Sequence, residues 1–153
     1  MKNRVVTLKD EIERIIASCD VCNLAMVDPE GRPYVIPMNF GYKDDVIYLH
    51  SAQKGRKIDI IRKNNRVSVS FSADHELRWQ SENVACSYSM KYRSVLAHGH
   101  VEFVEDMEEK AKCLNVIMKQ YTDREFTYND PALRDVMVFR VVVEKMEGRA
   151  YGY

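Results

Sequence analysis

The sequence has no excess of charge of either sign. Lys and Arg together number 23, Asp and Glu also number 23, and the formal net charge is zero. A general nucleic-acid-binding protein carries a marked basic excess that attracts phosphate, so nucleic acid is not an expected partner. The balance still allows one local basic pocket.

The sequence also lacks long apolar runs and is poor in cysteine, glycine and proline. No stretch approaches the roughly 20 apolar residues that cross a bilayer, and residues 1–9 contain no apolar signal segment. Four cysteines in 153 residues are typical of a reduced cytoplasmic protein rather than a disulfide scaffold. Six glycines and four prolines leave little room for a linker. We therefore expect a single cytoplasmic domain over residues 1–153, with no membrane partner.

What is present is a succession of strand patterns and a few helical ones. A helix is expected to begin near Leu8, with Thr7 as its cap, and to end by Asp20. Tight turns between strands favour a mainly β, antiparallel barrel with peripheral helices over a parallel doubly wound sheet. The patterns predict strands over 21–27, 33–42 with a break at Pro37, 46–50, 67–71, 92–104 and 136–145, helices over 53–63, 106–121 and from 129, and a loop over 73–83.

The segment from His50 to Ile58 carries the strongest chemical signal. A strand is expected to end there and a helix to begin, and Lys54, Arg56 and Lys57 place three cations within four residues. Cations at a helix N-terminus oppose the helix dipole unless an anion joins them. With free backbone N–H groups and the Ser51 hydroxyl they would form a phosphate cradle. The alternative is a solvated basic turn.

Three segments carry a resemblance to a known family. The segments Pro33–Tyr42, Val46–Ile58 and Tyr92–Phe103 resemble the FMN-binding split-barrel superfamily of pyridoxamine 5′-phosphate oxidase. They are most similar to its Nim-type branch, which is associated with 5-nitroimidazole resistance. The resemblance covers roughly residues 8 to 147 and implies an antiparallel split β-barrel.

That resemblance implies a homodimer with FMN bound in a groove between the subunits. Arg56 and Lys57 would hold the FMN phosphate, with Ser51 and Lys54 beside them, and Ser94 would supply a polar flavin contact. His50 would lie near the flavin, either as a catalytic proton donor or as a structural residue. Backbone groups along the isoalloxazine ring would come from Val35, Ile36, Pro37, Met38 and Asn39.

The implied activity is an FMN-dependent oxidoreductase. Reduced FMN would pass hydride or electrons to a small planar acceptor, such as a nitroimidazole or another nitro-aromatic, from an electron donor that the sequence does not identify. The C-terminal Trp and Arg segment of true pyridoxamine phosphate oxidases is absent, because this chain ends Gly148 to Tyr153. Vitamin metabolism is therefore not expected. A haem-binding or haem-degrading protein and a non-enzymatic flavin-binding module are the alternatives.

Two further motifs favour structural roles. Cys19 and Cys22 form a Cys-x-x-Cys pair, but the pair closes a helix instead of opening one, so we expect buried thiols and no metal site. His98 and His100 share one side of a predicted strand, where they are either solvated residues or ligands of haem iron or another metal.

Aromatic residues near the predicted loop leave a choice between packing and binding. Trp79, the only tryptophan, either anchors that loop to the barrel or covers a flat ligand, and we favour the anchor. The stretch 88–92, with Met90, is expected to belong to the core and a dimer contact.

Overall fold

The computed structural model describes all 153 residues and contains one eight-stranded antiparallel sheet with four α-helices. The strands are β1 (Asn3–Val6), β2 (Cys22–Val27), β3 (Pro33–Met38), β4 (Gly41–Lys43), β5 (Val46–Ala52), β6 (Arg66–Arg78), β7 (Ser89–Val104) and β8 (Val136–Tyr151). The helices are α1 (Lys9–Ala17), α2 (Arg56–Lys63), α3 (Met107–Lys119) and α4 (Asp130–Asp135), with a 3₁₀ turn, η1, at Ala85–Ser87.

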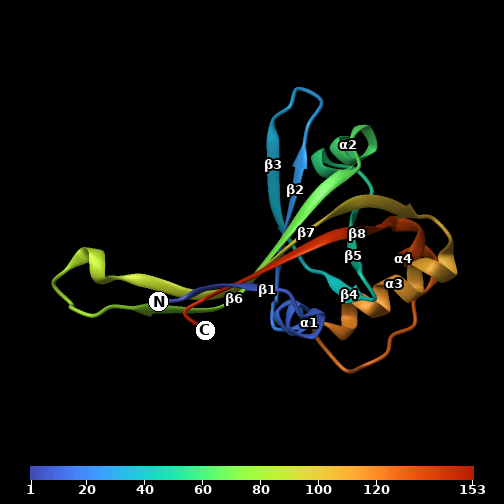
Figure 1. The fold of residues 1–153 in the computed structure, drawn as a ribbon. Helices are drawn as coiled ribbons and strands as arrows, with labels where there is room; N and C mark the ends of the chain where they lie inside the picture. The colour runs from blue at the N-terminus through green and yellow to red at the C-terminus, as the bar shows by residue number, and fades with distance from the viewer.

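The strand order is β3-β2-β6-β7-β8-β5-β4, with β1 paired to β8, and every pairing is antiparallel. The sheet is strongly curved (Figure 1). Its two free edges, β3 and β4, are successive in the chain and separated only by Asn39 and Phe40. This arrangement confirms the predicted mainly β fold with peripheral helices and the antiparallel split barrel.

The core lies on one face of the sheet because alternate residues of each strand are apolar. Val67, Val69 and Phe71 of β6 are buried, while Ser68 and Ser70 between them are not. The inner face packs against the isoleucines of α1 and α2. We call the opposite face the outer face. α3 and α4 cover part of it, over β4, β5 and the first half of β8.

Most predicted elements occur where expected, but several boundaries differ. The predicted cap at Thr7 is wrong, because Leu8 is the N-cap residue of α1 and no side chain caps that end. α2 begins at Arg56, three residues later than expected. Pro37 does not interrupt β3, since it pairs with Asn23 inside the ladder, and the chain breaks after Met38 instead. A proline is tolerated there because β3 is an edge strand.

The loop predicted over 73–83 is instead mostly strand. β6 and β7 continue past the barrel as a long hairpin, whose base is joined by β1 and the end of β8 (Figure 1). We call its outer part, residues 77–90, the arm. The preferred anchoring role of Trp79 is wrong, because its ring stacks on Tyr88 of the arm and remains 50% exposed. Tyr88 and Met90 are exposed as well, so their predicted place in the core is wrong.

No helix of the structure has both the length and the apolar character needed to span a bilayer.

Candidate functional site

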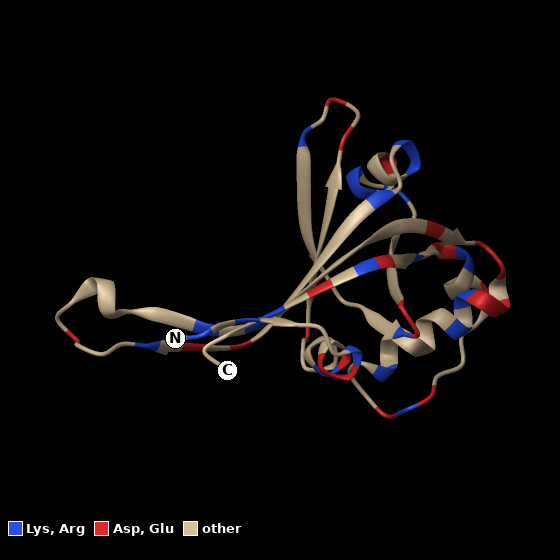
Figure 2. Ribbon diagram, viewed as in Figure 1, with Lys and Arg blue, Asp and Glu red and all other residues tan.

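The N-terminus of α2 concentrates positive charge next to unpaired backbone donors. β5 ends at Ala52, and residues 53–55 lead directly into Arg56, the first residue of the helix. No side chain caps this helix end. Figure 2 shows Lys and Arg side by side along α2. Lys54 and Arg56 are exposed and Lys57 is half-buried.

This helix end fits a phosphate group. Gly55, the N-cap residue, has φ of 146°, a conformation that favours glycine, and a Cβ built there would meet nothing within 4 Å. The space beside Gly55 is therefore open. Those groups and the cations of Lys54, Arg56 and Lys57 all favour an anion at the same place. The start of α2 thus fits a phosphate, and its role as a phosphate cradle stays a prediction.

Arg56 connects the helix to the free edge of the sheet. Its guanidinium carbon lies 4.4 Å from the ring centroid of Tyr34, a residue of β3. This cation–π contact holds the side chain over the inner face of the edge strand. The other side of β3 has no neighbouring strand. Its outward backbone groups are therefore available to a ligand that runs from the helix end along the edge.

The predicted ring-contact segment alternates across this edge strand. Val35 and Pro37 point to the outer face and are exposed, whereas Ile36 and Met38 turn toward the core. Asn39 follows the strand and is exposed. The sequence predicted flavin contacts from the backbone groups of residues 35–39. All five residues lie on β3, an edge strand, or directly after it.

The structure places His50 and Ser51 on opposite faces of β5, as successive strand residues must be. His50 lies opposite Val138 on the face that α3 and α4 border, and its side chain is exposed. The Ser51 hydroxyl donates to the carbonyl oxygen of Ala52 at 2.8 Å. Partial desolvation by nearby protein lowers the pKa of the His50 imidazole below 6.5. Neutral imidazole therefore predominates at neutral pH.

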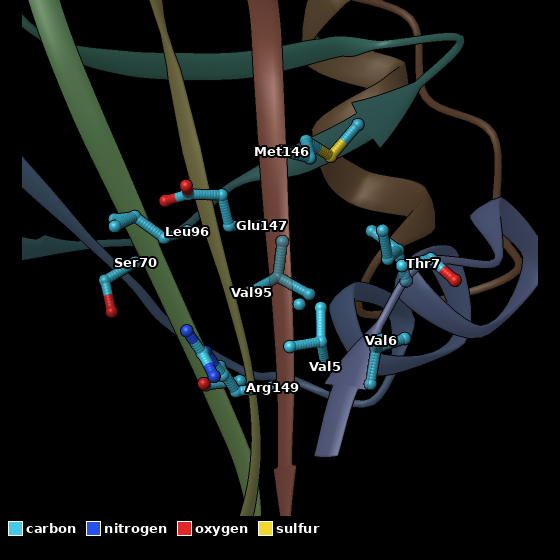
Figure 3. A pocket seen from close by; sticks show the side chains of 12 residues that line it. Val5, Val6, Thr7, Ser70, Val95, Leu96, Met146, Glu147 and Arg149 are labelled. Carbon is cyan, nitrogen blue, oxygen red and sulfur yellow. The ribbon is translucent and has the colours of Figure 1, made fainter.

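Ser94 lies apart from the cation cluster, on the outer face of β7. It lines a cavity of about 540 Å³ whose walls include residues of β1, β6, β7 and β8, as Figure 3 shows for its neighbours. The cavity wall combines apolar Val5 and Leu96 with the hydroxyl of Ser70 and the guanidinium of Arg149. Val35 and Pro37 share this outer face, because Val35 pairs with Ala25 and Ala25 pairs with Ser68.

Sequence reasoning missed Ser70 and Arg149. The only available signal was the strict alternation of serine with apolar residues in β6, which indicated one exposed face but not what lies across it. Arg149 belongs to the last part of β8, beyond the predicted end of that strand at residue 145.

The Cys-x-x-Cys pair is buried, as predicted. Cys19 is 3% exposed and Cys22 is fully buried. Burial raises the pKa of both thiols, that of Cys22 to about 12. A protonated thiol is a poor nucleophile, so neither residue suits redox chemistry.

We expect at most one of the four thiols to react with Ellman's reagent in the native protein. Cys86 is exposed, whereas Cys19, Cys22 and Cys113 are buried. All four should react after denaturation in guanidinium chloride. Absorbance of the released thionitrobenzoate measures the count, and rapid native reaction of two or more thiols would contradict the structural role of the pair.

His98 and His100 share the outer face, as the sequence predicted, and both are engaged by oxygen atoms. The Nδ1 of His98 lies 2.8 Å from the Ser68 hydroxyl, and its Nε2 lies 3.3 Å from Glu147. The Nδ1 of His100 lies 2.8 Å from Glu144. These contacts favour two solvated, hydrogen-bonded strand residues over a pair of ligands that await a metal.

The chain belongs to the pyridoxamine 5′-phosphate oxidase family, since a sequence profile of that family matches residues 9–150. The predicted family is thereby confirmed. None of the curated proteins is detectably similar to the chain.

Solved structures support the same assignment. A Bacteroides thetaiotaomicron protein named for 5-nitroimidazole antibiotic resistance is 47% identical, with a TM-score of 0.88 over 97% of this chain and 87% of its own. A FAD-binding protein from Mesorhizobium loti is 26% identical, with a TM-score of 0.72 over 99% of this chain and 100% of its own. The flavocytochrome Anf3 from Azotobacter vinelandii shares the fold, with a TM-score of 0.83 at 16% identity over 97% of this chain and 70% of its own.

Proposed function

We propose that the protein is an FMN-dependent oxidoreductase that reduces a small planar acceptor, such as a nitroimidazole or another nitro-aromatic. The observation that carries the proposal is the uncapped, cationic start of α2 beside the free edge of β3. Similarity to a protein named for nitroimidazole resistance, and to a FAD-binding protein, supports a flavin and this acceptor class.

The phosphate would be held by the start of α2. Arg56 and Lys57 supply positive charge, and the first backbone N–H groups of the helix supply donors without a side-chain competitor. Arg56 is already oriented by its contact with Tyr34, so little side-chain entropy is lost when it binds an anion. Ser51 and Lys54, which shortly precede the helix in the chain, would contribute beside them.

The flavin ring would lie along β3 and the outer face beside it. The backbone groups of β3 that face away from β2 have no strand partner, and those within residues 35–39 can hydrogen-bond polar ring atoms. Ser94 offers a hydroxyl on the same outer face. Val35, which is 57% exposed, would contact the apolar part of the ring and exclude water from it.

When bound in its reduced form, the flavin supplies the hydride or electrons. Reduction of a nitro group consumes protons as well, so the protein must hold a proton source near the acceptor. His50, at the end of the strand that leads into the phosphate cradle, is our candidate. Its imidazole is exposed and can exchange protons with solvent. Because its pKa is lowered, the imidazolium releases its proton at a lower pH than an ordinary histidine does.

The functional unit would be a homodimer. The outer face near Ser94 is not covered by any helix of its own chain, and it exposes apolar side chains such as Val5 and Leu96. A ligand that lies on such a face is half in water unless a second copy encloses it. A groove between two copies gives the flavin and its acceptor a shared, dry site.

The test is reconstitution of the purified protein with FMN, followed by anaerobic reduction and mixing with a nitroimidazole. We expect the visible absorption bands of a bound flavin and their reappearance as the acceptor is reduced. A Soret band after reconstitution with haem would instead favour the haem-binding alternative. Tight FMN binding with no reoxidation by any nitro-aromatic would indicate a flavin-binding module without this activity.

A further inference from the structure

The ladder register determines which outer-face side chains are level with one another. Ser94 of β7 lies opposite Ser72 of β6 and Arg149 of β8. We call these three residues the central row. Side chains on one face recur every second residue, so neighbouring rows are about 7 Å apart along the strands.

The arm carries the outer face well beyond the barrel. Leu77 lies opposite Met90, and the ring of Trp79 stacks on Tyr88 with centroids 5.5 Å apart. Residues 88 and 94 are three rows apart, which places the Trp79–Tyr88 pair about 20 Å from the central row.

The arm has little support from its own chain: Ser89 contacts Met1, and Met1 and Tyr151 share a cavity with arm residues. Its four outer-face residues Leu77, Trp79, Tyr88 and Met90 are between 37% and 50% exposed. Residues 77–90 include only two charged residues, Arg78 and Glu82, and Figure 2 shows this segment almost free of charge. A two-stranded hairpin is marginally stable in water by itself. A charge-poor surface with exposed aromatic residues is typical of an interface core.

A complementary hollow lies at the other end of the same face. A cavity of about 340 Å³ opens there, with walls that include Val27, Pro33, Arg66 and His98. Arg66 lies opposite His100, which is three rows from Ser94 in the direction away from the arm. The arm tip and the cavity are therefore equally distant from the central row.

A two-fold axis along the central row, running across the strands, would pair these two features. Such an axis reverses the direction along the strands. A row on the arm side of the central row in one copy therefore faces the row at the same distance on the cavity side in its partner. The arm tip of each copy then meets the cavity of the other copy, over the same strands β6 and β7. The assembly ends at two copies, because each copy uses both its arm tip and its cavity in the contact.

The exposed apolar area is also of the right size. Eight large apolar side chains of the outer face are between 37% and 57% exposed: Val5, Val27, Val35, Leu77, Trp79, Tyr88, Met90 and Leu96. With fully exposed aromatic side chains near 150–250 Å² and aliphatic ones somewhat smaller, the exposed apolar area is on the order of 550 Å². A standard protein interface needs about 800 Å² from each partner.

We propose that the arm exchanges between two copies of this chain and that its Trp79–Tyr88 pair fills the cavity beside β2 and β3 of the partner. The Arg66 side chain is 76% exposed at the cavity rim, where its guanidinium can lie against an incoming aromatic ring. Val35 lies in the row of His98, which also lines the cavity, so each arm delivers an aromatic pair beside the edge strand of the partner. Given the proposed flavin site, the arm forms part of that site's wall.

Sedimentation velocity of the flavin-free protein at micromolar concentration tests the exchange. We expect the wild type to sediment as a dimer of 17.9 kDa chains. Trp79→Glu, on the arm, and Val27→Glu, in the cavity, should each halve the observed mass, because each buries a charge in the same contact. The double variant Trp79→Glu/Val27→Lys should restore the dimer, because it sets opposite charges across both contacts.

The matched control is Phe126→Glu, which introduces the same charge at an apolar residue that is 37% exposed and lies outside the sheet. It should stay dimeric. Circular dichroism melting checks that every variant is folded. A monomeric wild type, or a dimer that survives either Trp79→Glu or Val27→Glu, would overturn the exchange.

Trp79 also reports its own environment, because it is the only tryptophan. Its emission should be blue-shifted in the wild-type dimer relative to monomeric Val27→Glu, and added FMN should quench it in the dimer. Equal emission in both proteins refutes the arm contact. Bound FMN without quenching refutes the arm's place in the flavin site. Failure of FMN to bind at all refutes the proposed function and that place together, while the sedimentation result for the exchange stands.

Discussion

Replacing Arg56 by alanine is expected to weaken FMN binding by roughly 30- to 100-fold, or about 2–3 kcal/mol. The side chain supplies a charge-assisted contact to a phosphate at the start of α2, where no other side chain caps the helix. Riboflavin lacks the phosphate, so its affinity should change little. Flavin fluorescence titrations of wild type and Arg56→Ala with both ligands measure the difference.

Arg62→Ala is the matched control for this experiment. Arg62 lies in the last turn of the same helix, and its guanidinium carbon is 4.6 Å from the ring centroid of Phe103. It removes an equal charge and a similar cation–π contact but leaves the helix start intact. If Arg62→Ala weakens FMN binding as much as Arg56→Ala, general electrostatics explains the effect. If Arg56→Ala weakens riboflavin binding equally, the phosphate assignment is wrong.

Replacing His50 by alanine is expected to lower nitro-aromatic turnover per bound flavin by roughly 100-fold, with FMN still bound. The reason is loss of a proton donor, since the imidazole lies on the face of β5 away from the barrel core and is exposed. A structural role predicts the reverse, with weaker FMN binding and nearly intact turnover. Stopped-flow reoxidation of pre-reduced protein, normalised to flavin occupancy, separates the two.

The pH dependence gives an independent check on His50. Its pKa is lowered below 6.5, so the charged, donating form is abundant only in mildly acidic solution and falls as the pH rises through that value. Wild-type turnover should therefore decline between pH 6 and pH 8, by up to about tenfold per unit. His50→Ala should show no such decline, and His75→Ala, which removes another exposed histidine, should behave as wild type. Equal normalised rates for wild type and His50→Ala across this range would exclude proton donation.

Local patterns were sufficient for the helices and the barrel strands. Alternating apolar residues such as Val67 and Val69 have a buried face in any sheet, so the pattern alone identifies the strand. The cationic turn was equally readable, because Lys54, Arg56 and Lys57 act within one turn of chain. The sequence could therefore place these three cations beside the start of a helix, where a phosphate cradle stays a prediction. The buried Cys19–Cys22 pair followed from its position between a helix and a strand.

Only the tertiary structure showed which side chains of different strands lie next to one another in the sheet. The sequence predicted a loop over residues 73–83 of the hairpin formed by β6 and β7, because the polar residues from Asp74 on bury no face within their own chain. Strand geometry separated His50 from Ser51, and the register of β8 brought Arg149 to the cavity beside Ser94. The sequence determines which side chains are apolar and favour burial, because hydrophobicity is a property of each side chain alone. Which face remains uncovered depends on how distant strands pair, and that is settled only when the whole sheet is assembled.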